Sequence, residues 1–373
     1  MNKYILEPDL AGMMTTGRGL CVSLVIPTHR TSPARRSDEF TAGKIIEFAK
    51  KELCGKYRTR GGEALAARVQ ELAEKIDFVH SSEGIGIFVS KNHARLVSFP
   101  FPVKKKLVIG DSFEVRDLVY RENFMADYYV LSLSEKIVRL FKGNGPSLRE
   151  IKDGTFPARY RDTYEYSRPA RGSSVSSSLK GAEKDKSVVE EKRLQAFFHE
   201  LDKKLSAYIN SAVPMLLAGA RKDNGYFMKV SVHGKSIIGK VEGNFNHGST
   251  QTLADAAWVR MLGFLKKKAS SAVEEIREQD NGRKVSSGIS NVWNAATQGR
   301  GLSLVVEKNF TRPAFLGEDG FTLLMHPPRG KHKVLADAVD DIIEIVLSKN
   351  GTVKFVDDGA LAGHEGIALI NRY

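Results

Sequence analysis

The 373-residue sequence is poor in several features that mark large classes of protein. It has two cysteines, Cys21 and Cys54, too few for a disulfide framework or a cysteine-rich zinc site. The N-terminus shows no basic start followed by an apolar core, and no apolar run approaches transmembrane length. We therefore expect a reduced cytoplasmic protein that is not inserted in a membrane.

The sequence also lacks a motif for catalysis or cofactor binding. Gly234–Lys240 (GKSIIGK) has the glycine and lysine spacing of a phosphate-binding loop, but Val241 follows where Ser or Thr would hold magnesium. His364 and Glu365 are not followed by the second histidine of a zinc-protease helix, and no Ser/His/Asp pattern or set of carboxylates stands out. We interpret the phosphate-loop string as a chance match, and we expect no catalytic residue, metal site or cofactor.

Positive charge is present in excess. The chain has 57 Lys and Arg residues against 44 Asp and Glu residues, which gives a formal net charge of +13. This balance favours a polyanionic partner such as nucleic acid or an anionic membrane surface.

A basic and aromatic stretch is 155–181 (TFPARYRDTYEYSRPARGSSVSSSLKG), which has no helical or strand periodicity and so cannot cover a core. Arginine forks bind phosphates, and flat aromatic faces stack on unpaired bases. The stretch therefore indicates an RNA-contacting loop, although a solvated linker has the same composition. Its candidate RNA-binding residues are Arg159, Tyr160, Arg161, Tyr164, Tyr166, Arg168, Arg171, Gly172, Ser173 and Ser174.

A second group of basic residues lies in the first third of the chain. Residues 28–36 (THRTSPARR) follow a predicted strand, and residues 54–63 (CGKYRTRGGE) join two predicted helices. Basic groups of this kind can bind RNA phosphates, with an ordinary charged turn as the alternative for residues 54–63. The candidate RNA-binding residues of this second group are His29, Arg30, Lys56, Tyr57, Arg58 and Arg60.

The rest of the chain mixes strand and helix patterns, which predicts an α/β fold, α+β overall. Strands are expected at 20–27, 84–90, 94–99, 107–109, 128–133, 137–142, 215–220, 302–306, 322–325, 353–356 and 367–370. Helices are expected at 40–53, 64–76, 188–209, 253–272, 285–297 and 334–347.

Several strings follow one another in an order that resembles a known family. They are CVSLVIPTHR, EGIGIFVS, RLVSFPFPVKKKLVIGDSFEVRDLV, YYVLSLSEKIVRLFKGNG, PMLLAGARKD and the closing pattern from VVEKNF to GIALINRY. Together they resemble the archaeal and eukaryotic class-I release factors and Pelota. The resemblance is greater to the bacterial branch of that family, which includes ribosome hibernation factors of the Balon type. It extends from about Gly19 to Tyr373.

The resemblance implies three domains. Residues 1–124 would form an N-terminal α/β domain that reaches the decoding centre, which is where the tip at residues 54–63 would lie. Residues 125–267 would form a ribonuclease-H-like middle domain whose loop, 155–181, reaches the peptidyl-transferase centre. Residues 268–373 would form a ribosomal-protein-like α/β/α domain that contacts a translational GTPase, in bacteria elongation factor Tu.

The departures from the family pattern bear on function. Release factors carry Gly-Gly-Gln in the middle-domain loop, and stop-codon readers carry Asn-Ile-Lys-Ser between the first helices. Here those places hold ARGSSVSSSLKG and CGKYRTRGGE, so neither hydrolysis nor codon reading is supported. We therefore expect a ribosome hibernation factor, monomeric when free, that acts in a stress response and occupies the A site without hydrolysing peptidyl-tRNA.

Two alternatives remain open at the level of sequence. One is a rescue or peptide-release factor that uses a non-standard loop. The other is a nuclease built on the ribonuclease-H-like core, although no acidic cluster for metal ions stands out in residues 125–267.

Overall fold

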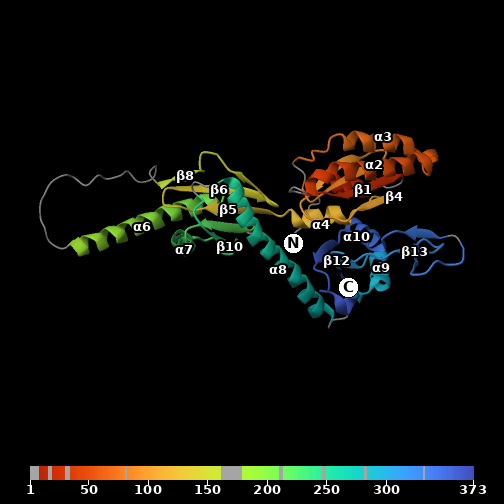
Figure 1. The fold of residues 1–373 in the computed structure, drawn as a ribbon. Coiled ribbons are helices and arrows are strands. Elements are labelled where there is room, and N and C mark those ends of the chain that lie inside the picture. Colours follow the sequence, from red (N-terminus) through yellow and green to blue (C-terminus); the bar gives the residue numbers. More distant parts are fainter. Residues whose placement is uncertain are drawn as a thin grey trace. The chain divides into compact units, whose positions relative to one another are not determined.

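The computed structural model describes residues 8–15, 19–29, 34–79, 82–160, 179–209, 213–245, 249–280, 284–330 and 332–373 (Figure 1). The chain divides into two compact units. The larger unit contains Met1–Phe124 together with Lys267–Tyr373, and the smaller, middle unit contains Met125–Lys266. Within the described ranges, no helix has an apolar stretch that could span a membrane.

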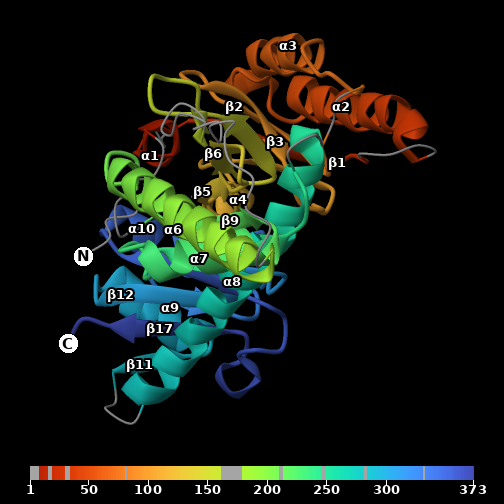
Figure 2. The ribbon, with the colours of Figure 1, turned by 90° about the vertical axis from the view of Figure 1, so that its left-hand side faces the viewer.

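The N-terminal part of the larger unit is a four-stranded antiparallel sheet. Its strands, in spatial order, are β3 (Ala94–Phe99), β2 (Gly84–Val89), β1 (Cys21–Pro27) and β4 (Lys106–Gly110). The helices α2 (Asp38–Gly55) and α3 (Gly62–Ala73) lie side by side in both ribbon views (Figures 1 and 2), and their apolar faces share a core with β1. The short segments α1 (Pro8–Thr15), η1 (Ala34–Ser37) and α4 (Arg116–Phe124) complete this part.

Strand β1 is buried on both faces because alternate side chains enter different cores. Val22, Leu24 and Ile26 contact the core under α2 and α3. Cys21 and Val25 point to the opposite side and belong to a second hydrophobic cluster. This arrangement explains why the strand is a continuous apolar run in the sequence.

The C-terminal part of the larger unit has three layers, α/β/α. Its main sheet has the order β11 (Val285–Ser287), β17 (Ile367–Asn371), β12 (Gly301–Glu307), β16 (Thr352–Val356). The helices α9 (Ile289–Thr297) and α10 (Ala338–Ser348) cover one face, and the C-terminal half of α8 (Thr250–Asp280) covers the other. A small sheet, in the order β14 (Leu323–Leu324), β13 (Ala314–Leu316), β15 (Lys333–Leu335), and the turn η3 (Ala362–His364) follow the same part of the chain.

One hydrophobic cluster is common to the N-terminal and C-terminal parts of the larger unit. It contains Phe88 and Phe99 of the first sheet together with Trp293 and Ile343 of the last helices. Burying a large apolar side chain stabilises a fold by about 1.5–3 kcal/mol relative to leaving it exposed. The two ends of the chain therefore stabilise each other as one body.

The middle unit contains the sheet order β10 (Ile237–Glu242), β9 (Met215–Gly219), β5 (Asp127–Ser132), β6 (Ile137–Asn144), β7 (Ser147–Glu150). The strands β5, β6 and β7 form an antiparallel meander, whereas β9 and β10 are parallel to β5. A meander extended by two parallel strands is the ribonuclease-H-like arrangement that the resemblance implies. The expected mixed α/β fold is thus confirmed.

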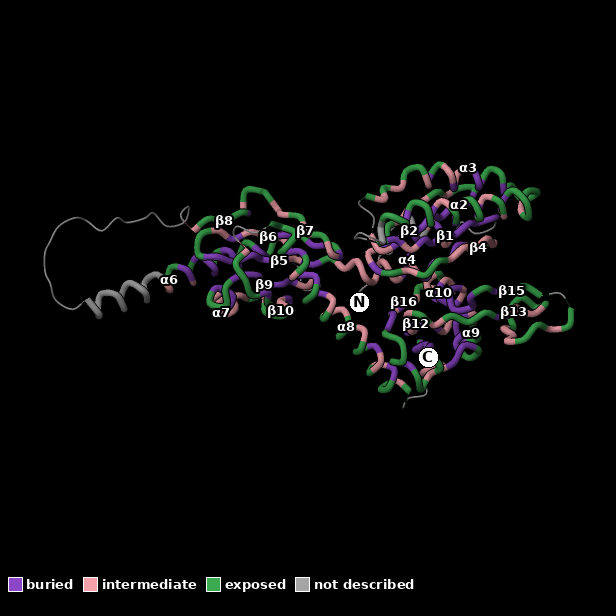
Figure 3. The backbone as a smooth tube through the Cα atoms, in the orientation of Figure 1, coloured by how far each residue is buried: buried purple, intermediate pink, exposed green. Residues whose placement is uncertain are grey.

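Helices cover both faces of the middle sheet. The predicted apolar face of the long helix α6 (Leu179–Leu205), from Leu194 to Leu205, is buried against one face together with α7 (Arg221–Val230). On the other face Trp258 of α8 stacks on Tyr128 of β5, with ring centroids 6.2 Å apart. The pattern of exposed and buried positions along these helices is visible in Figure 3.

Some predicted elements are wrong in their extent. The helices predicted at 285–297 and 334–347 begin later, because each is preceded by a short strand, β11 or β15. Gly288, with a φ of +74°, precedes the first of these helices, and the Asp337 carboxylate caps the second by accepting the N–H of Val339. The predicted helix at 253–272 is longer, and α4, α7 and β10 were not predicted. Most of the GKSIIGK string lies in or beside β10, so it is no phosphate-binding loop.

Candidate nucleic-acid interface

The predicted tip at residues 54–63 is a tight turn between α2 and α3. After α2 ends at Gly55, Arg58–Arg60 form the short helix η2. Gly61 has a φ of +86°, a conformation that favours glycine. A Cβ on Gly62 would lie 2.0 Å from the carbonyl oxygen of Leu53, so only glycine lets the two helices approach this closely. The Gly-Gly-Glu string here therefore has a structural explanation.

The tip presents basic side chains around an anchored tyrosine. Tyr57 is half-buried against the core, and its hydroxyl donates to the carbonyl oxygen of Ile109 at 3.4 Å. Lys56, Arg58 and Arg60 are exposed. The structure thus brings together the four candidates of this loop, with Tyr57 acting as a support for the basic groups.

Acidic neighbours hold two of these basic groups. The Nε atom of Arg58 lies 2.9 Å from Glu63, and an Nη atom of Arg60 lies 2.6 Å from Asp111. Both pairs are exposed, so each contributes at most about 1 kcal/mol and can be exchanged for another anion. The Lys56 ammonium lies 5.6 Å from the Tyr57 ring centroid.

The candidate residues after β1 have a different environment. The backbone N–H and the Nδ1 of His29 contact the two carboxylate oxygens of Asp38, at 2.6 and 2.7 Å. Asp38 is buried in the first turn of α2, so His29 joins the end of β1 to the start of that helix. Its ring is still half-exposed. Arg30 lies outside the described residues.

Of the candidate loop in the middle unit, the structure describes the N-terminal residues, up to Tyr160. The strand β8 (Ala158–Arg159) pairs with β6, and Arg159 is exposed. The Tyr160 ring packs edge-to-face on Phe197 of α6, with centroids 5.6 Å apart. Tyr160 therefore anchors the loop to the domain. The remaining candidates lie outside the described residues: Arg161, Tyr164, Tyr166, Arg168, Arg171, Gly172, Ser173 and Ser174.

A carboxylate fixes the turn that leads into this loop. Asp153 accepts the hydroxyl of Tyr208 at 2.7 Å and the backbone N–H groups of Thr155 and Phe156. The Tyr208 hydrogen bond and these two N–H groups hold the pKa of Asp153 below its usual value. Phe156 is fully buried. These contacts, which the sequence pattern did not indicate, define where the loop leaves the core.

Among the described residues of the middle unit, possible catalytic groups do not assemble into a known catalytic arrangement. The Ser206 hydroxyl lies 3.3 Å from Nε2 of His233, but the nearby Asp202 carboxylate binds the hydroxyl of Ser231 and the N–H of Val232. In a Ser/His/Asp site the carboxylate would instead orient the histidine. Within the described ranges, no three His, Cys, Asp or Glu residues are grouped as metal ligands.

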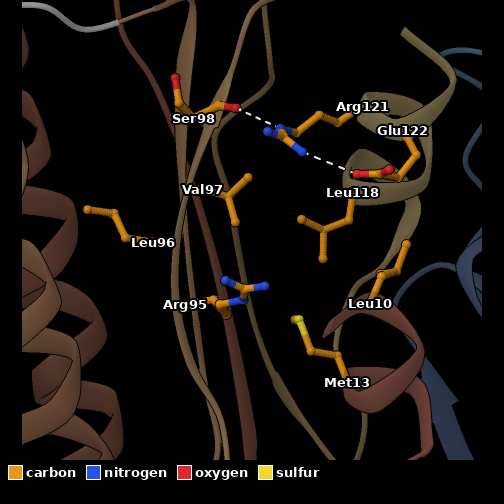
Figure 4. Close-up of a pocket in the computed structure, with 9 residues that line it drawn as sticks. All are labelled: Leu10, Met13, Arg95, Leu96, Val97, Ser98, Leu118, Arg121 and Glu122. Carbon is orange, nitrogen blue, oxygen red and sulfur yellow. Dashed lines mark hydrogen bonds and ion pairs between the residues drawn. The ribbon is translucent and has the colours of Figure 1, made fainter. Parts of the chain in front are cut away.

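A hollow of about 150 Å³ lies between α1, β3 and α4 of the larger unit (Figure 4). Leu10 and Met13 of α1 line it, and Arg121 lies on its rim. The Arg121 guanidinium donates to the carbonyl oxygen of Ser98 at 3.1 Å and pairs with Glu122 at 3.2 Å. None of the predicted site residues lines this hollow, so it is separate from the candidate interface.

Residues 127–300 match the model of a protein family described as bacterial archaeo-eukaryotic release factor family 3. The match includes nearly all of the middle unit and the start of the C-terminal part. Fold and match together define a release-factor-like protein. Over these residues the chain is similar to the bacterial branch of the archaeal and eukaryotic release factor family, which confirms the predicted resemblance. A specific closeness to the Balon type stays a prediction.

Several solved structures are similar to the chain. The archaeal translation termination factor aRF1 is 14% identical, with 100% of this chain and 99% of that chain covered and a TM-score of 0.25. Archaeoglobus fulgidus Pelota is 15% identical, with 75% of each chain covered and a TM-score of 0.38. S. cerevisiae Dom34, a translation termination-like factor that interacts with Hbs1, is 13% identical, with 78% and 79% covered and a TM-score of 0.37. Comparison with curated protein sequences finds no match.

Proposed function

We propose that the protein is a ribosome hibernation factor that binds the A site and occupies the decoding and peptidyl-transferase centres without hydrolysing peptidyl-tRNA. The observation that carries this proposal is the exposed basic tip of Lys56, Arg58 and Arg60. The tip ends a two-helix hairpin, where the release-factor resemblance implies contact with the decoding centre. The net charge of +13 supports a polyanionic partner, and we expect the protein to work in the cytoplasm and to be a monomer when free.

The ion pairs at the tip suit exchange with rRNA. A guanidinium fork can bind a phosphate through two parallel hydrogen bonds, which are stronger than an exposed contact with Glu63 or Asp111. Those internal pairs orient Arg58 and Arg60 in the free protein. Because each pair contributes little to stability, breaking it on binding rRNA costs little free energy. Tyr57 keeps the backbone of the turn fixed to the core.

The middle-unit loop would occlude the peptidyl-transferase centre. Its described end is anchored by Tyr160 on Phe197 and by the turn around Asp153. The sequence between these anchors and α6 is rich in Arg and Tyr but has no Gly-Gly-Gln, the family's water-positioning motif. Such a loop would bind RNA without activating a water molecule.

The C-terminal part would contact a translational GTPase, with elongation factor Tu as the expected partner in bacteria. The basic segment Pro327–Lys333 joins β14 to β15, and Arg329 and Lys333 are exposed there. Removing residues 268–373 would also remove most of the core shared with the N-terminal part, so point substitutions are the better test. Arg329→Ala with Lys333→Ala should weaken co-purification with elongation factor Tu while ribosome binding by the tip persists.

Peptide release through a non-standard loop is the second candidate function. It is favoured by the match to a family of release factors over the residues that include the loop. Release of labelled peptide from ribosome-bound peptidyl-tRNA separates the two functions, because a hibernation factor binds the same ribosomes and releases none.

The experiment that tests the proposal is sedimentation with purified ribosomes, using the triple variant Lys56→Ala, Arg58→Ala, Arg60→Ala beside the unmodified chain. The variant should bind more weakly and show a shallower dependence of affinity on salt, by about 0.7–0.9 in log–log slope per lost phosphate contact. Its melting temperature should change little, because the lost ion pairs are exposed. Unchanged ribosome affinity in the variant would contradict the proposed role of the tip.

A further inference from the structure

The outer face of α2 carries two phenylalanines in solvent. Phe40 is 68% exposed and Phe48 is 56% exposed, whereas the opposite face of the helix is buried in the core. The two positions are eight residues apart, slightly more than two helical turns, so both side chains lie on the same side. Isolated exposed apolar residues are ordinary, but a spaced pair of aromatic rings beside basic groups needs an explanation.

Basic side chains lie between and beyond the two rings. Lys44 is midway between them, and its ammonium lies 4.1 Å from the Phe40 ring centroid. Lys51 is exposed one turn after Phe48. The nearby Glu47 carboxylate is engaged by Lys50 at 2.6 Å, so it offsets little of the positive charge on this face.

The face lies on the helix that leads to the basic tip. Exposed Arg36 stands just before α2, and the helix leads directly to Lys56 and Arg58. From Phe40 to Lys51, within the 18 residues of α2, the face is about 17 Å long. Alternating rings and cations offer contacts to both bases and phosphates of a strand, since every base has a face that can stack.

We propose that this face of α2, defined by Phe40, Lys44, Phe48 and Lys51, binds an unpaired segment of RNA beside the site reached by the tip. The lysines would neutralise phosphates and the phenylalanines would stack on bases. The inference rests on the proposed function for its setting, a ribosome, and extends it by naming a second RNA contact and the chemistry of its ligand.

A protein partner fits the face less well. An amphipathic helix that docks in a protein groove presents apolar anchors at positions i, i+3, i+4 and i+7. Here the position between the rings is Lys44, and Lys51 follows, so a groove would have to bury ammonium groups. RNA accepts both kinds of side chain without that cost.

The test uses the full chain, an unstructured oligouridine as probe, and purified ribosomes. The double variants Phe40→Ala/Phe48→Ala and Phe40→Leu/Phe48→Leu should both bind oligouridine more weakly, about tenfold or more for each lost stack. The variant Phe40→Tyr/Phe48→Tyr should bind like the unmodified chain, because the aromatic face is kept. Phe321→Ala is the matched control, since Phe321 is 71% exposed in the C-terminal part and lies outside the proposed face.

The possible outcomes separate the inference from the proposed function. If the Leu variant bound oligouridine and ribosomes with full affinity, apolar volume would suffice for binding and the inference would be overturned. If the Ala variant also kept full affinity, neither side chain would contribute to binding, and the inference would again be overturned. Ribosome binding that persists in those variants leaves the hibernation proposal standing. Conversely, the protein could bind oligouridine in a way that requires the aromatic rings and yet fail to bind ribosomes. That result would support RNA binding by α2 and would contradict the proposed function. Equal melting temperatures of all variants verify that folding is unaffected.

Discussion

A carboxylate oxygen of Asp340 accepts the backbone N–H of Arg116 at 2.6 Å. The other carboxylate oxygen accepts the N–H of Val115 at 3.1 Å, so a residue of α10 caps the start of α4, more than two hundred positions earlier in the chain. The Arg116 side chain pairs in turn with Asp337 at 3.2 Å. These buried contacts join the N-terminal and C-terminal parts of the larger unit beside the hydrophobic cluster that the two parts share.

Replacement of Asp340 should destabilise the larger unit. The Asp340→Ala variant leaves the two buried N–H groups of Val115 and Arg116 without an acceptor, which costs on the order of 3 kcal/mol. Chemical denaturation monitored by Trp293 fluorescence measures the effect. Glu278→Gln, at an exposed position of α8, is the control and should change the unfolding free energy by less than about 0.5 kcal/mol. Equal stability of both variants would show that the cap contributes little.

The stability of the larger unit should fall as the pH rises from about 4 to about 7. Burial raises the pKa of Asp341 from 3.8 to about 7, with Glu344, Glu114 and Asp337 acting in the same direction and Lys333 opposing them. The folded chain therefore binds more protons than the unfolded chain between these two values, and stability is lost as the group ionises. One such group contributes a slope of at most about 1.4 kcal/mol per pH unit.

Asp341→Asn removes the group that titrates, so it should flatten this pH dependence and raise stability at pH 8. Urea denaturation at a series of pH values checks both expectations. Burial also raises the pKa of Glu344, so some slope should remain in the variant. An unchanged slope would mean that Asp341 does not titrate in this range.

Glycine substitutions should separate close packing from helix propensity at the tip. Gly62→Ala places a Cβ 2.0 Å from the Leu53 carbonyl oxygen and should cost about 1–3 kcal/mol through forced separation of α2 and α3. Gly43→Ala, in the interior of α2 with nothing within 4 Å of the added Cβ, should instead stabilise by about 0.5–1 kcal/mol. Thermal unfolding measures both. If both substitutions had the same sign, the close helix approach would not be the reason for glycine at position 62.

Replacing residues 161–178 with a short Gly-Ser linker should weaken protection of the peptidyl-transferase centre on ribosomes. The replacement leaves β8 and the Tyr160–Phe197 contact in place, so the domain keeps its core. Chemical footprinting of the rRNA measures protection, and labelled peptidyl-tRNA reports release. The unmodified chain should release no peptide. Efficient release that the replacement abolishes would make the protein a hydrolase and would contradict the hibernation proposal.

The sequence by itself determined the elements whose side chains face one core with a regular period. The apolar run of β1 and the stripe from Leu194 to Leu205 on α6 are found where they were predicted, because burial of one face imposes the period of the strand or helix. The mixed α/β fold and the family resemblance followed from the same strings. The basic tip was visible as well, since its residues are neighbours in the chain.

The tertiary structure decided what depends on residues that are distant in sequence. The short strands β11 and β15 look helical alone and become strands only because β17 and β13 offer hydrogen-bonding edges. As a charged residue, Asp340 would be expected at the surface of α10, but in the structure it is buried and caps the start of α4. Phe40 and Phe48 are exposed although apolar side chains are usually buried. Their exposure is decided by which side of α2 packs on the sheet. Local periodicity reports how a segment meets one neighbour, whereas a cap, an edge strand or an exposed ring is set by groups that only folding brings near.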